Sequence, residues 1–175
     1  MANTYSIISS NVLGSSAATV TFSSIPATYT DLVLRISSKS DSTGDIKANV
    51  NIVINGTTTG YSVTNMFATS GTTGANRQTS AANWNRFYTD SSYSVDFTNA
   101  FGLLEIYFSN YAGSNNKVAS GFGVSESNSS TDYFINATAN LWQNSSAISS
   151  IALGLNSGQN FVTGSSFYLY GIKNS

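Results

Sequence analysis

The sequence predicts an all-β protein, an antiparallel β-sandwich of jelly-roll type with about ten strands. Apolar residues alternate with polar ones in short runs, a spacing of two that is typical of strands with one buried face. Clusters of Gly, Asn, Ser and Asp separate these runs, and the apolar spacing of a helix is missing almost everywhere. Because 175 residues is the size of one domain, we expect a single sandwich over residues 1–175. A closed barrel is the alternative architecture.

The clearest strand pattern lies at residues 47–54. Every second position is apolar from Ala48 to Ile54, while Asn49 and Asn51 lie between them. The Asn55-Gly56 pair that follows is favoured in tight turns where both central residues need positive φ. The ten predicted strands are Tyr5–Ser9, Ala18–Phe22, Leu32–Ser38, Lys47–Ile54, Tyr61–Met66, Gly102–Ser109, Lys117–Val124, Phe134–Leu141, Ile148–Leu155 and Ser166–Ile172.

A long loop is predicted near residues 67–93, because this stretch is rich in Ser, Thr, Asn and Gly. Loops of this length are uncommon in compact domains and are often functional. Its aromatic side chains are therefore candidates for contact with a partner, and packing into their own core is an equal alternative. A tryptophan at the end of a predicted strand is a further ligand candidate. The interface or ligand candidates are Trp84, Phe87, Tyr88, Tyr93 and Trp142.

Several strands are apolar on both faces. Leu103 and Tyr107 share the face of Glu105, opposite an apolar face, and Tyr168 and Tyr170 lie opposite Phe167 and Leu169. We favour a thick sandwich core that buries both faces, with a subunit interface as the alternative. Glu105 and Arg35 each lie on the polar face of a strand, and a cross-strand ion pair is favoured over an acid catalyst.

The composition excludes several classes of function. Charged residues make up only 9% of the chain, far below the usual quarter, and the net charge is −1. The few basic residues form no stripe, so we expect no nucleic-acid partner. No apolar run is long enough to span a membrane, and the N-terminus lacks the basic and apolar regions of a secretion signal.

Catalysis and metal binding have few candidate residues. The chain contains no His and no Cys, which excludes the usual serine triad and thiolate metal sites. Asp41 and Asp45 with loop carbonyls form a weak Ca²⁺ pattern, and a turn capped by Asx hydrogen bonds is favoured instead. Two carboxylates facing across a groove, as in a glycosidase, are the one chemistry left open. We expect no enzyme activity, no cofactor and no metal.

Segments near the two ends of the chain resemble a recurring pattern in bacteriophage virion proteins. These β-sandwich proteins decorate capsids or form parts of fibres and tails, and the middle of the chain is unmatched. The resemblance implies a fold and a structural role and carries no catalytic or ligand residues. The segments that carry it are VTFSSIPATYTDLVLRISS at 20–38, VNIVING at 50–56, GYS at 60–62 and GSSFYLYGI at 164–172.

The leading hypothesis is a non-enzymatic structural protein of a phage particle, made in the host cytoplasm and located in the virion. A capsid decoration or head-fibre subunit would bind other virion proteins and copies of itself, trimers included, by non-covalent contacts. The alternative is a carbohydrate- or receptor-binding module of a tail fibre, with Trp84, Tyr88 or Trp142 as the sugar platform. The least favoured hypothesis is a glycan-cleaving enzyme that uses Glu105 and Glu126.

Overall fold

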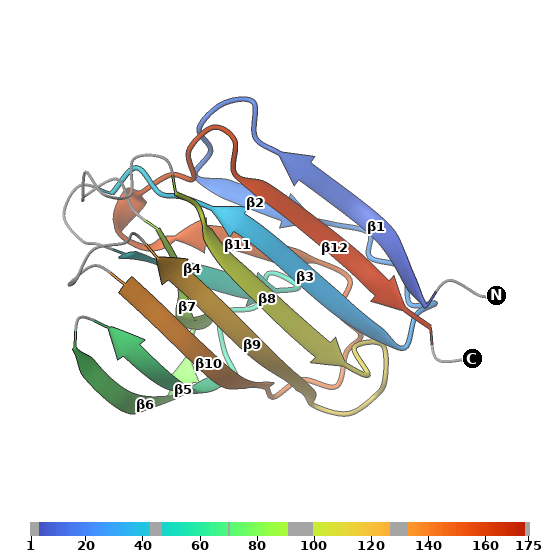
Figure 1. The fold of residues 1–175 in the computed structure, drawn as a ribbon. Coiled ribbons are helices and arrows are strands. Elements are labelled where there is room, and N and C mark those ends of the chain that lie inside the picture. The colour runs from blue at the N-terminus through green and yellow to red at the C-terminus, as the bar shows by residue number, and fades with distance from the viewer. Residues whose placement is uncertain (1–3, 43–46, 70, 91–99, 127–132, 174–175) are drawn as a thin grey trace.

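A computed structural model describes residues 4–42, 47–69, 71–90, 100–126 and 133–173. These residues form an antiparallel β-sandwich of two sheets, which confirms the predicted all-β sandwich (Figure 1). The larger sheet has eight strands in the order β1-β12-β3-β8-β9-β10-β5-β6. The smaller sheet has four strands in the order β2-β11-β4-β7 and covers part of one face of the larger sheet (Figure 1).

All ten predicted strands are present, and two more occupy the segment predicted as a long loop. The strands are β1 (Tyr5–Val12), β2 (Thr19–Phe22), β3 (Asp31–Ser38), β4 (Lys47–Ile54), β5 (Tyr61–Thr69), β6 (Thr72–Ala81), β7 (Trp84–Asp90), β8 (Gly102–Ser109), β9 (Lys117–Glu126), β10 (Tyr133–Trp142), β11 (Ile151–Leu155) and β12 (Ser166–Ile172).

The prediction of a loop over residues 67–93 is therefore wrong, for two physical reasons. Strand β6 is an edge strand with few large apolar residues, so it carries no alternating pattern. In β7 the two fully buried side chains, Trp84 and Phe87, are three residues apart, which hides the spacing of two. The register explains this spacing, because Trp84 lies opposite Ile52 and Phe87 opposite Val50, with a bulge between them.

The core lies between the two sheets and is rich in aromatic rings. The Trp84 side chain is fully buried, and its ring lies edge-on to Tyr61 with centroids 5.9 Å apart. Its Nε1–H donates a 3.0 Å hydrogen bond to the Leu141 carbonyl oxygen in β10. Tyr61 also stacks on Trp142, which is 1% exposed. These rings join the small sheet to the large one.

The Asn55-Gly56 turn has the predicted conformation, with φ of 51° and 66°. The Thr57 N–H donates to the Ile54 carbonyl oxygen at 3.0 Å and closes the turn. The Asn55 side chain also holds the segment before β11, because its Nδ2 donates to the Ala147 carbonyl oxygen at 2.8 Å. The turn thus connects strands that belong to different sheets.

The middle of β9 and of β10 reverses the ordinary pattern: small or polar residues point inward there, and large apolar residues point outward. On β10, Asn136, Thr138 and Asn140 point into the sandwich and are buried, while alternate apolar residues point outward. On β9 the inward positions include Gly121, which the Phe87 ring of β7 approaches closely. The interior at these positions has room only for small or polar side chains, so in the middle of both strands the larger apolar residues face away from the core, whereas the aromatic residues at the two ends of β10 point inward and are buried.

Gly121→Ala should lower the free energy of unfolding by roughly 2 kcal/mol, because an added Cβ overpacks the interior. That Cβ would meet the Phe87 ring and lie 2.7 Å from Thr138 Oγ1. Gly154→Ala is the matched control, since its Cβ would lie 3.7 Å from the Ala18 carbonyl oxygen, an ordinary contact. Urea unfolding of both variants measures the difference, and equal stability of the two would contradict this packing.

Candidate interaction surface

Nine large apolar side chains are exposed in the part of the chain that the structure describes, and all of them lie on one face. This outer face consists of the side chains of the eight-stranded sheet that point away from the four-stranded sheet. The strand registers place each of the nine on it. They are Tyr5, Ile7, Val12, Met66, Leu103, Tyr107, Val118, Phe122 and Ile135.

The opposite surface of the sandwich has a different character. Outward positions of the four-stranded sheet carry Thr19 and Thr21 on β2, Asn49, Asn51 and the half-buried Val53 on β4, and Ala152 on β11. Single exposed apolar residues are normal on a protein surface, but a contiguous apolar patch marks a binding site. The concentration of exposed apolar side chains on the outer face therefore indicates an interaction surface.

An ion pair lies near the middle of the outer face. Arg35 on β3 and Glu105 on β8 are directly opposite in the register, and Arg35 Nε donates a 2.6 Å hydrogen bond to Glu105 Oε2. The prediction of a cross-strand ion pair is confirmed. The two side chains are 56% and 51% exposed, so the pair adds little to the stability of the free chain.

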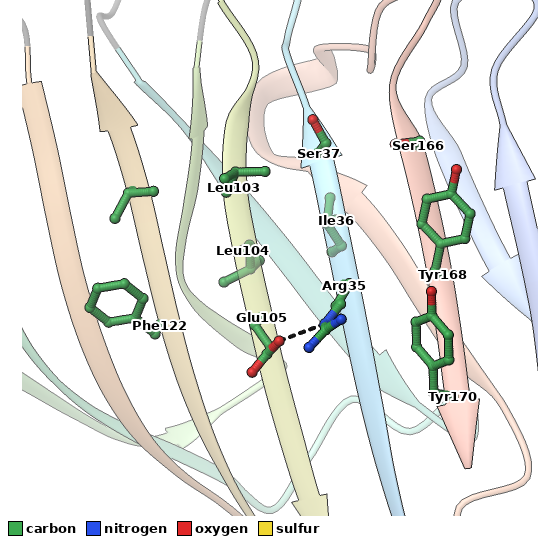
Figure 2. Close-up of a pocket in the computed structure, with 11 residues that line it drawn as sticks. Arg35, Ile36, Ser37, Leu103, Leu104, Glu105, Phe122, Ser166, Tyr168 and Tyr170 are labelled. Atoms are coloured by element: carbon green, nitrogen blue, oxygen red, sulfur yellow. Dashed lines mark hydrogen bonds and ion pairs between the residues drawn. The ribbon is translucent and has the colours of Figure 1, made fainter. Parts of the chain in front are cut away.

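Aromatic and aliphatic side chains surround this pair and form a groove of about 570 Å³. Figure 2 shows Tyr168 and Tyr170 of β12 on one side of the pair and Phe122 of β9 on the other. The two tyrosine rings lie side by side, with centroids 6.5 Å apart and planes 25° apart. The Arg35 guanidinium carbon lies 5.8 Å from the Tyr170 ring centroid.

The prediction that a thick core buries both faces of these strands is wrong for the outer face. Leu103 is 55% exposed and Tyr107 is 36% exposed, while Tyr168 and Tyr170 are half-buried. The four-stranded sheet packs only on the inward face, so nothing in the chain's described part covers these side chains. Of the two alternatives, the subunit interface remains a prediction.

No protein-family model, curated protein or solved structure matches this chain. The site is therefore assigned from its own geometry.

The structure does not place the sequence-predicted candidates on a common surface. Trp84, Phe87 and Trp142 are fully buried, so the prediction that they are contact residues is wrong. Tyr88 is half-buried, and its ring lies edge-on to Phe134 with centroids 4.4 Å apart. Tyr93 lies outside the described residues. The sequence did not predict the outer face as a contact surface. The alternation shows that both faces of a strand are apolar, but it does not show which of the two the second sheet covers.

The carboxylates of the described residues form no metal site: no group of three or more acidic side chains lies together there. Asp41 accepts hydrogen bonds of 2.7 Å from both the backbone N–H and the side-chain amide of Asn160, so it joins two loops. The turn that Asp41 was predicted to cap, and Asp45 with it, lie outside the described residues. No helix in the described part of the chain has the length and apolarity needed to span a membrane.

Asp31 fixes one end of the outer face. Its carboxylate accepts a 2.6 Å hydrogen bond from the Tyr107 hydroxyl and a 2.7 Å hydrogen bond from the Asn110 N–H. The hydrogen bond to Asp31, together with partial burial and the carboxylate's charge, raises the pKa of Tyr107 to about 12. The tyrosine therefore stays neutral, and its ring stays in place, well into the alkaline range.

This hydrogen bond predicts a specific loss of stability at alkaline pH. A tyrosine in the unfolded chain ionises near pH 10, about two units below Tyr107 in the folded protein. The contribution of Tyr107 is therefore present below pH 10 and lost as the pH rises to about 12. The Tm of Tyr107→Phe should be below that of wild type at pH 7, and the gap should narrow between pH 10 and 12. Calorimetry across this range measures the gap; a constant gap would contradict the assignment.

Proposed function

We propose that this chain is a non-enzymatic structural protein of a phage particle, a capsid decoration or head-fibre subunit that assembles through its outer face. One observation carries the proposal: the exposed apolar side chains of the described residues gather on a single sheet face. A surface of this kind loses water favourably when a complementary protein surface covers it. The resemblance of segments near both ends of the chain to virion proteins agrees with this role.

The electrostatics of the outer face also suit a buried contact. Its central charges, Arg35 and Glu105, already neutralise each other, so covering them costs less than covering a lone charge. Other outward positions around them carry Ser, Ala, Val, Leu, Phe and Tyr. Such a face can approach a protein surface closely without long-range repulsion.

The strand order supports the jelly-roll interpretation of the sandwich. Without the hairpins β5-β6 and β9-β10, the sheets reduce to the orders β1-β12-β3-β8 and β2-β11-β4-β7. Two four-stranded sheets in which early and late strands alternate are the arrangement expected of a jelly roll, a fold common in capsid proteins. The two hairpins widen only the larger sheet, and they carry Met66, Val118, Phe122 and Ile135 of the outer face.

Quantitative mass spectrometry of purified virions tests the role directly. Particles from the host that produces this chain should contain it in many copies, and its absence from banded particles would contradict the proposal. Phe122→Asp puts a charge into the apolar face and should reduce incorporation at least roughly tenfold, because burying an unpaired charge is costly. Thr21→Asp on the four-stranded sheet is the control and should be incorporated like wild type.

A second function, carbohydrate or receptor binding in a tail fibre, is favoured by the Tyr168–Tyr170 pair. Neighbouring aromatic rings with similar orientation give a platform on which a sugar ring can stack, and the nearby Arg35 and Glu105 offer polar partners for hydroxyl groups. This platform replaces the one predicted at Trp84, Tyr88 and Trp142, of which the two tryptophans are buried.

Glycan-array binding separates this second function from the first. If the groove holds a glycan, Tyr168→Ala and Tyr170→Ala should each weaken binding by roughly tenfold or more, the loss expected for one aromatic contact. Tyr5→Ala, which changes an exposed tyrosine at the edge of the same sheet, should leave binding unchanged. Failure of the wild-type chain to bind any glycan on the array would remove this alternative.

A further inference from the structure

We infer that the outer face binds a second copy of the chain about a two-fold axis parallel to β3 and β8, placing Arg35 of each copy over Glu105 of the other. The inference rests on the proposed assembly role and names its partner and geometry. It follows from three properties of the face: the position of its charges, the distribution of large and small side chains, and its area.

The charges are self-complementary. Arg35 and Glu105 lie side by side on neighbouring strands, so a two-fold axis running between those strands exchanges their positions. In a face-to-face pair, each guanidinium then lies over a carboxylate of the other copy. The four groups form a square of alternating sign, in which every charge has a partner within its own chain and another across the interface. Charge complementarity of this kind fixes the register of an interface and rejects other partners.

The side chains around the charges are also complementary under the same axis. The strand registers arrange the face in rows, and the row through the ion pair runs Ser10, Tyr168, Arg35, Glu105, Phe122, Ala137. The axis places Tyr168 of one copy over Phe122 of the other, which are both aromatic. In the next row it places Tyr170 over Ser120.

Large residues meet small ones at other positions. In the row of Tyr170, the axis also places Ile7 over Ala139 and Val33 over Tyr107. In the row on the far side of the ion pair, Leu103 lies over Ser37. Alternation of large and small side chains across two facing sheets is what lets them interdigitate at the usual spacing of about 10 Å.

The area is sufficient for a stable dimer. Rotation about this axis places six strands of one copy, from β1 to β10 in the sheet order, over the same six strands of the other copy. Strands β5 and β6 stay outside the contact. Six strands of about eight residues cover roughly 29 Å by 26 Å, or about 750 Å² per copy. A standard protein interface buries about 800 Å² per partner, which is close to this area. Two sheets joined in this way resemble a second sandwich core.

Charge-reversal variants test the arrangement. Arg35→Glu brings four carboxylates together at the axis, and Glu105→Arg brings four guanidinium groups together. Each should raise the dimer dissociation constant roughly 100-fold or more, because like charges are then forced into contact. An equimolar mixture should form a heterodimer, since every carboxylate of one variant then lies over a guanidinium of the other. Light scattering should give the mass of one chain for each variant alone and twice that mass for the mixture.

Two further variants serve as controls. Arg77→Glu makes the same charge change on β6, outside the overlapping strands, and should leave dimerisation unchanged. The double variant Arg35→Glu/Glu105→Arg restores the alternating square and should dimerise like wild type. Circular dichroism of each variant checks that it is folded, which is expected because both side chains are more than half exposed.

The outcomes separate this inference from the proposed role. A monomeric or trimeric wild type at micromolar concentration overturns the two-fold dimer, as does a mixture of the two variants that stays monomeric. Neither result bears on virion incorporation, which mass spectrometry of particles measures independently. Conversely, a dimer that follows the charge pattern in a chain absent from virions supports the interface and overturns the phage role.

Discussion

The exposed face depends on the close approach of β7 to the inner side of β9 and β10. The Phe87 ring and the Thr138 hydroxyl group occupy the space that a side chain at Gly121 would need. Because the interior there accepts only small or polar groups, large apolar residues are excluded from the inward positions in the middle of these strands, although Phe134 and Trp142 point inward at the two ends of β10. Their alternation then has one remaining orientation, with Phe122 and Ile135 outward. The constraint inside the sandwich thus determines the character of the surface outside it.

The inward polar residues form hydrogen bonds that fit this register, although the buried Oδ1 atoms of Asn136 and Asn140 have no hydrogen-bond partner among the described residues. Asn140 Nδ2 donates to the Ala119 carbonyl oxygen at 3.2 Å and to Thr138 Oγ1 at 2.8 Å, and Asn136 Nδ2 donates to the Arg86 carbonyl oxygen at 2.7 Å. Buried amides need such partners, and sliding β10 by one residue would break them while exchanging both faces. The hydrogen bonds inside and the apolar side chains outside therefore select the same register.

The alternation of apolar and polar residues in the sequence predicted the features that depend on neighbouring residues alone. Spacing of two located ten strands, and polar positions on two of them were enough to predict the Arg35–Glu105 pair. The sequence could not show that β7 carries a bulge, so the spacing of Trp84 and Phe87, three residues apart, hid a strand, and the polar composition of residues 67–93 predicted a loop instead. It also could not show which apolar face the second sheet covers, because that follows from long-range pairing. The candidate surface was therefore found only once the sheets were assembled.

The sheet edges are less suited to assembly than the outer face. An exposed edge strand offers free backbone groups, and proteins commonly disrupt such strands with bulges, twists or charges. Here β1 has an irregular register between Ile7 and Ser9, and the pairing of the other edge strand, β6, shifts between Tyr61 and Val63. Strand β6 also carries Arg77 and mostly polar side chains. These features disfavour edge-to-edge growth into open fibres, whereas the outer face is left apolar. A face that meets its own copy about a two-fold axis closes after two chains, so the same chain can expose a large apolar surface without assembling indefinitely.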